Sequence, residues 1–133
     1  FRLPGKGRGR FGAAGRAVYN NTMKRTSESR EAFRNGDWGP KYLCRGPHCE
    51  WGVILLKPGQ TMSAHGHRTV VEDFYVIEGS AVMSVGDAEV TLETGDVLRA
   101  DPGEMHAIAN RGEKPMRLVF IKAPYLPTDK IDG

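Results

Sequence analysis

Short apolar or alternating stretches recur along the chain from residue 41 onward, and turn-forming residues separate them. Alternation with a period of two, interrupted by turn residues at intervals of about 8 to 12 positions, is typical of an all-β sandwich or barrel. The pattern predicts a hairpin from residues 41–44 and 49–56, with further strands within 59–79 and at 80–85, 88–92, 97–100, 107–110 and 116–122. We therefore predict an all-β fold of many short strands.

The two ends of the chain do not fit this strand pattern. The sequence TSESREAF, residues 26–33, predicts at most a short helical turn with a Ser or Thr cap, and NGDWGP at 35–40 ends it. The ending APYLPTDKIDG contains two prolines and is predicted to leave the sheet, wrapping over the surface or a partner. The chain thus divides into an extended arm with a helical turn at 1–39, a barrel at 40–125 and a C-terminal tail at 126–133.

Length and composition describe an ordinary globular chain. With 133 residues it builds one domain around one core, and its 39% hydrophobic and 26% charged residues are typical of soluble proteins. No apolar run approaches the roughly 20 residues of a membrane span, and the start does not resemble a secretory signal. Two cysteines are too few for a disulfide scaffold. These features predict a cytoplasmic protein without a membrane partner.

The positive charge of the chain is concentrated at its start. Residues 1–30 contain eight Lys or Arg and one acidic residue, whereas residues 31–133 contain eleven basic and fifteen acidic residues. The sequence FRLPGKGRGRFGAAGR would suit nucleic acid phosphates, a solvated leader, an extension upstream of a start at Met23, or a packed arm. We disfavour nucleic acid and predict an arm packed on a neighbouring subunit, because it has too few apolar residues for a core of its own.

Three of the four histidines fall in two short segments with a carboxylate between them. His65 and His67 are two positions apart, so on a strand both imidazoles project from the same face. Glu72 follows after a short connection, and His106 follows the turn at 101–103. Solvent-facing histidines are the alternative, but imidazoles and a carboxylate that converge on one point suit a divalent metal such as Zn, Fe, Mn, Ni or Cu.

The spacing of these residues resembles that of a known family, the cupins. Residues 59–79 read Gly-x5-His-x-His-x4-Glu-x6-Gly, which matches the first cupin motif in full. Residues 95–110 resemble the second motif, Gly-x5-Pro-x-Gly-x2-His-x3-Asn, except that Asp101 stands at the usual proline and the proline is Pro102. The resemblance covers about residues 40–125. Within it, the chain is similar to small single-domain microbial cupins.

This resemblance implies a fold, a cofactor and an assembly. The implied fold is a double-stranded β-helix, the jelly-roll barrel, and the implied cofactor is one divalent transition metal ion per chain (Zn, Fe, Mn or Ni). The implied metal ligands are His65, His67, Glu72 and His106. The resemblance also implies a homodimer, in which the N-terminal strands of one chain cover the sheet edge of its partner. The arm and the apolar strand at 51–56 suit that assembly.

The cavity of such a barrel would bind a small molecule, and the sequence leaves the chemistry open. Arg99 offers a fork for a carboxylate or phosphate if it faces inward, and a surface charge if it faces outward. The candidate apolar pocket walls, for each of which plain core is the alternative, are Met62, Phe74, Met83, Ile108 and Phe120. No residue stands out as catalytic.

Two functions remain open at this point. One is a metal-dependent enzyme, of isomerase, dioxygenase or decarboxylase type, that acts on an oxygen-rich small molecule such as a sugar, a sugar phosphate or a small carboxylate. The other is a non-enzymatic cupin that binds a sugar or carboxylate. We favour the enzyme, because the chain carries no regulatory module beside the barrel.

Overall fold

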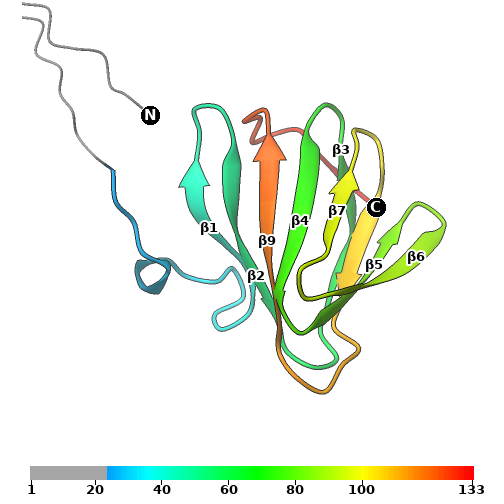
Figure 1. The fold of residues 1–133 in the computed structure, drawn as a ribbon. Helices are drawn as coiled ribbons and strands as arrows, with labels where there is room; N and C mark the ends of the chain where they lie inside the picture. The colour runs from blue at the N-terminus through cyan, green and yellow to red at the C-terminus, as the bar shows by residue number, and fades with distance from the viewer. Residues whose placement is uncertain (1–23) are drawn as a thin grey trace, which may run out of the picture.

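A computed structural model describes residues 24–133, and predictions about residues 1–23 of the basic arm lie outside this range. Ten strands form two five-stranded sheets in which every neighbouring pair is antiparallel (Figure 1). In spatial order, the first sheet contains β1 (Gly39–Arg45), β2 (Glu50–Leu56), β9 (Met116–Ala123), β4 (Val71–Glu78) and β7 (Val97–Ala100). The second contains β10 (Lys130–Asp132), β3 (Thr61–His67), β8 (His106–Ala109), β5 (Ser80–Val85) and β6 (Ala88–Glu93). The predicted all-β architecture is confirmed.

The predicted helical turn near the start is also confirmed, but its N-cap residue, Ser27, makes no capping hydrogen bond through its side chain. It is a single 3-10 turn, η1 (Glu28–Arg30), which packs beside the first sheet. The Glu28 carboxylate lies 2.5 Å from Nη2 of Arg117 and 3.8 Å from Nζ of Lys41, so ion pairs fix the turn to strands of the same chain. No helix within the described range is long and apolar enough to cross a membrane.

The inward-facing positions of the first sheet change from apolar to polar along the strands. On β9, Leu118 and Phe120 face the core, and Lys122 follows them at the same two-residue spacing. The register then places Lys122 opposite both Glu50 on β2 and Glu72 on β4, while Phe120 lies opposite Phe74. One end of the barrel is therefore a packed apolar core, and the other end carries a row of charged side chains.

The C-terminal segment departs from the prediction. We expected residues 126–133 to leave the sheet, but β10 pairs with β3 and places Lys130 opposite His67 and Asp132 opposite His65. The Asp129 carboxylate holds this return, because its Oδ2 accepts the backbone N–H groups of Thr69 (2.8 Å) and Val70 (2.9 Å). The prolines end β9, but the three residues after Asp129 are free to pair.

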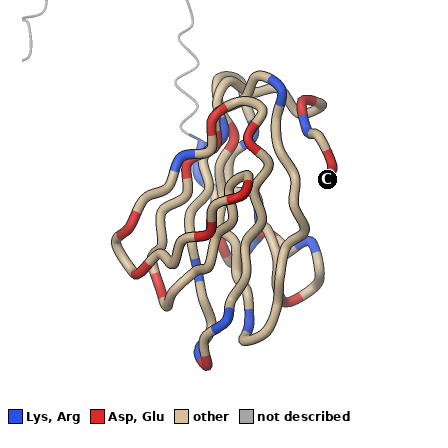
Figure 2. Tube along the Cα trace, turned by 90° about the vertical axis from the view of Figure 1, so that its right-hand side faces the viewer, with Lys and Arg blue, Asp and Glu red and all other residues tan. Residues whose placement is uncertain are grey.

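Charge is distributed differently in the described part than in the leading arm. Figure 2 shows Lys and Arg interspersed with Asp and Glu along the trace. Acidic residues outnumber basic ones over residues 31–133, fifteen to eleven. The basic pI of about 9.0 therefore comes from the first 30 residues and not from the barrel.

Candidate metal centre

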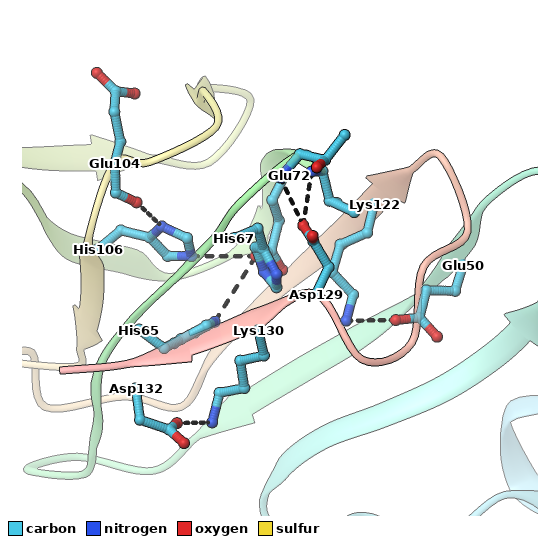
Figure 3. A network of polar contacts seen from close by, with 12 residues as sticks. Glu50, His65, His67, Glu72, Glu104, His106, Lys122, Asp129, Lys130 and Asp132 are labelled. Carbon is cyan, nitrogen blue, oxygen red and sulfur yellow. Dashed lines mark hydrogen bonds and ion pairs between the residues drawn. The ribbon is translucent and has the colours of Figure 1, made fainter.

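Three neighbouring strand segments bring the four predicted ligands together (Figure 3). His65 and His67 project from one face of β3, and His106 begins β8 directly opposite His65 in the register. Glu72 reaches the same point from β4 of the facing sheet. One ligand atom from each residue lies within 4.8 Å of all the others.

The distances centre on one carboxylate oxygen. Oε2 of Glu72 lies 2.9 Å from Nε2 of His67, 3.1 Å from Nε2 of His106 and 3.8 Å from Nε2 of His65. The opposite ring nitrogens of two histidines face backbone carbonyls: Nδ1 of His106 lies 3.0 Å from O of Glu104, and Nδ1 of His65 lies 3.3 Å from O of Ser63. Because a carbonyl only accepts, Nδ1 of each ring can donate to it, and Nε2 remains for the cluster. Nε2 donates to Glu72 when it carries a proton and offers a lone pair to a metal when it does not.

Burial makes this arrangement depend on a cation. His106, Glu72 and His67 are 1%, 3% and 6% exposed. Burial raises the pKa of Glu72, but hydrogen bonds from His106 and His67, together with His65 at 3.8 Å, outweigh it and hold that pKa well below its usual range. Those hydrogen bonds need a proton on each Nε2. When these protons are absent, the buried carboxylate and the imidazole lone pairs meet at one point and repel one another unless a metal ion lies between them.

The donor set fits a divalent transition metal. Metal–nitrogen and metal–oxygen bonds of about 2.0–2.2 Å place ligand atoms roughly 3 to 4.4 Å from one another, which agrees with a set whose members all lie within 4.8 Å. Three imidazole nitrogens and one carboxylate suit Zn, Fe, Mn or Ni, and six-coordinate ions would keep open positions for a ligand. This group can therefore hold a metal, and the identity of the metal is open.

Comparison with known proteins agrees with this geometry. The cupin domain family model matches residues 52–122, which include all four cluster residues. The chain belongs to the cupin family. The structure also resembles a protein with a double-stranded β-helix domain from Klebsiella pneumoniae, with a TM-score of 0.72 and 24% identity over 84% of this chain and 97% of that one. A second neighbour, TT1209 from Thermus thermophilus, has a TM-score of 0.64 and 26% identity over 77% and 98% of the two chains. The predicted jelly roll is thus confirmed.

Relatives with assigned names match over shorter stretches. The tetracenomycin polyketide synthase protein TcmJ of Streptomyces glaucescens is 39% identical over 80 residues, which cover 60% of this chain and 54% of the relative. The oxalate-binding protein of Thermotoga maritima is 30% identical over 68 residues, which cover 51% of this chain and 56% of the relative. The chain spans only about half the length of these curated relatives.

The histidine–glutamate cluster of this cupin opens onto a cavity of about 460 Å³. His65, His67 and Glu72 form part of its wall, and Met62 and Phe120, two of the predicted pocket residues, line it as well. The C-terminal segment contributes another part of the wall, with Leu126 and Lys130 among its lining residues. The return of this segment to the sheet therefore shapes the cavity.

Four other predicted pocket residues lie elsewhere. Phe74, Met83 and Ile108 are at most 1% exposed and belong to the core below the cavity, so they do not line it. Arg99 lies on the outer face of the first sheet, where it forms a two-pronged ion pair with Asp73 (2.7 and 2.8 Å). Strand parity explains its direction, because its neighbour Ala100 is buried and pairs with inward-facing Glu72.

Sequence reasoning missed a second polar group in the cavity wall. Nζ of Lys122 lies 2.5 Å from Oε1 of Glu50 and 3.2 Å from Oη of Tyr42. Oε2 of Glu50 accepts from Nε of Arg45 at 3.1 Å, and Nη2 of Arg34 donates to Oη of Tyr42 at 3.3 Å. A signal was present, because Glu50 and Lys122 interrupt otherwise apolar inward positions, but the pairing of β2 with β9 was needed to interpret it.

Proposed function

We propose that this cupin is a metal-dependent enzyme acting on an oxygen-rich small molecule. The observation that supports this proposal most strongly is that the histidine–glutamate cluster lies at the wall of a 460 Å³ cavity and not in a closed core. A divalent metal held by His65, His67, Glu72 and His106 would act as a Lewis acid that polarises a carbonyl or stabilises enolate-like charge. The chain's own contribution is to hold the ligands, exclude water and orient the substrate.

The cavity wall indicates the size and character of the substrate. Its volume lies within the roughly 300–1,000 Å³ range of sites for medium-sized organic ligands. Trp38, Met62, Phe120 and Leu126 supply apolar wall, whereas the metal ligands are all at one side. We infer a substrate with an apolar or aromatic body and adjacent oxygen atoms. The likeness to a polyketide synthase protein supports a polycarbonyl substrate over a single sugar, a sugar phosphate or a two-carbon acid.

Several reaction types fit the proposed substrate class. Isomerase, decarboxylase and dioxygenase chemistry would all use a carbonyl or enolate oxygen near the cluster. Ring closure of a polycarbonyl chain would use the same placement, because it also passes through enolate-like charge.

A second candidate is a cupin that binds a small carboxylate without reaction. The observation that favours it is the likeness to a relative named as an oxalate-binding protein. The same cluster would orient a carboxylate through the metal, and the apolar part of the cavity would then have no ligand body to contact.

Turnover separates the two candidates. The protein, loaded separately with zinc, manganese or iron, is incubated with an aromatic triketone, and mass spectrometry follows loss of water, loss of carbon dioxide or gain of oxygen. The enzyme proposal predicts metal-dependent product that disappears in His106→Ala and persists in His48→Ala, whose imidazole is exposed on the loop between β1 and β2. Saturable binding without product under all three metals supports the binding candidate.

We also propose a homodimer and a cytoplasmic location. The outer face of the first sheet exposes large apolar residues, and a second copy would cover them. These residues are Trp51, Tyr75, Ile77, Val97 and Ile121. Light scattering that finds a monomer at micromolar concentration would contradict the dimer.

A further inference from the structure

The second polar group, which lies beside the histidine–glutamate cluster, is built like a ligand-binding subsite. Lys122 and Glu50 lie in register on adjacent strands, and the next strand in that row carries Glu72 of the metal cluster. Figure 3 shows the Lys122–Glu50 ion pair beside the histidine cluster. Because cross-strand neighbours have Cβ atoms about 5 Å apart, one small molecule can contact Lys122 and the metal centre at once.

The hydrogen bonds around Tyr42 leave one donor without an acceptor. Its Oη accepts from Lys122 Nζ at 3.2 Å and from Arg34 Nη2 at 3.3 Å. Both partners are cations that only donate, so the Tyr42 hydroxyl proton has no acceptor among the contacts of the described residues. The ring is held from the side by Phe120, with the ring centroids 5.1 Å apart in an edge-to-face arrangement. The hydroxyl is thus fixed at the cavity wall with a proton to donate.

The charges of this group do not balance. Arg34, Arg45 and Lys122 are three cations, and within the described residues Glu50 is the one carboxylate within 4.0 Å of any of them. Glu50 is 4% exposed and uses one oxygen for Arg45 and the other for Lys122. Burial lowers the pKa of Lys122, but the Glu50 carboxylate, Tyr42 and Glu72 outweigh it and raise that pKa, so the amine stays charged.

We propose that Tyr42, Lys122 and Arg34 form an anion subsite, so that the ligand of this cupin is an organic anion bound at two points. One end of the ligand places its oxygen atoms at the histidine–glutamate cluster. The other end presents a carboxylate or enolate oxygen that accepts from the Tyr42 hydroxyl and lies beside the two cations. This inference rests on the proposed metal-dependent function and specifies its substrate class.

A purely structural role makes a different prediction. If Lys122 and Glu50 served only to join β2 to β9, Tyr42 and Arg34 would affect the stability of the barrel but not the choice of ligand. A ligand series that changes only the charge of the far end separates the two roles.

The test uses full-length zinc-loaded protein and benzohydroxamates, whose hydroxamate group chelates zinc. Each probe carries a carboxylate or a neutral carboxamide at the meta or para ring position, and calorimetry measures the affinity of all four. We expect at least one carboxylate to bind about tenfold more tightly than its carboxamide, because hydrogen bonds to charged groups are the stronger kind. Tyr42→Phe and Arg34→Gln should each reduce this ratio severalfold, whereas Arg99→Gln on the outer face should leave it unchanged.

Each outcome bears on a separate claim. Equal affinity of acids and amides in the wild type would overturn the anion subsite while leaving the metal centre intact. An equal loss of preference in Arg99→Gln would overturn it too, because the preference would then come from net charge alone. If no hydroxamate binds to protein that has taken up zinc, the metal has no position open for a ligand. That result would also overturn the proposal that the ligand binds at two points. Tyr42→Phe keeps the ring that contacts Phe120, so its circular dichroism should match that of the wild type.

Discussion

Gly66 lies between the two histidines of β3, and its α-carbon faces the turn that leads to His106. A methyl group added there would lie 2.9 Å from Sδ of Met105 and 3.1 Å from O of Glu104. The thioether is flexible and can move away, but the Glu104 carbonyl is backbone and also accepts from Nδ1 of His106 at 3.0 Å. An ordinary contact begins near 3.4 Å, so this carbonyl or β3 itself must move by about 0.3 Å.

We expect Gly66→Ala to weaken zinc binding about tenfold, or about 1.4 kcal/mol. The shift approaches the roughly 0.5 Å tolerance of a preorganised site, and loss of a ligand's supporting hydrogen bond typically costs 10- to 100-fold in metal affinity. Competition with a chromophoric zinc chelator measures the change. Gly112→Ala is the matched control, because a methyl there meets only Oδ1 of Asn110 at an ordinary 3.4 Å.

The reasoning is refuted if Gly66→Ala folds like the wild type and binds zinc with the same affinity. That result would mean that the turn before His106 does not position its imidazole. A loss of equal size in Gly112→Ala would point to a general effect of alanine on the fold instead.

Three further predictions concern pH, the C-terminal strand and the core. Acidification should release zinc, because protons compete with the metal for the ligand atoms; zinc that stays bound below the usual pKa range of carboxylates would contradict this. Asp129→Ala should speed amide hydrogen exchange at Thr69 and Val70 and weaken zinc binding, and exchange unchanged from the wild type would show that β10 holds without this carboxylate. Met83→Ala should cost about 2–5 kcal/mol in a denaturant titration without changing hydroxamate affinity, since Met83 is core and not cavity wall.

The sequence predicts the four-residue cluster because one part of its geometry is local and the other part matches known family motifs. His65 and His67 share a strand face by period alone, and the spacing to Glu72 and His106 matches two family motifs. Strand identity was also accessible, because turns rich in glycine and proline separate the apolar stretches.

Long-range pairing explains what the sequence does not predict. The second polar group of the cavity wall joins residues up to 88 positions apart, which meet only through the β1–β2–β9 register. These residues are Arg34, Tyr42, Glu50 and Lys122. Arg99 could not be oriented because β7 has only four residues, and its parity depends on pairing with β4.

The sequence also does not predict at which end the barrel opens. Phe74 and Glu72 both face the barrel interior, but Phe74 lies in the closed core and Glu72 lies at the cavity wall. The C-terminal strand was missed because its prolines suggested an exit, while the Asp129 contacts that return it to β3 span about 60 positions.

Metal content tests the central claim most directly. The wild type, His67→Ala and His48→Ala are purified without a metal-affinity tag or chelator, and plasma mass spectrometry measures each transition metal per chain. We predict close to one divalent ion per chain in the wild type and in His48→Ala, and a large loss of metal in His67→Ala. The reason is that His67 belongs to the cluster and His48 does not. Equal metal content in all three proteins, or none in the wild type after reconstitution with zinc, manganese, iron and nickel, would contradict a metal centre at these residues.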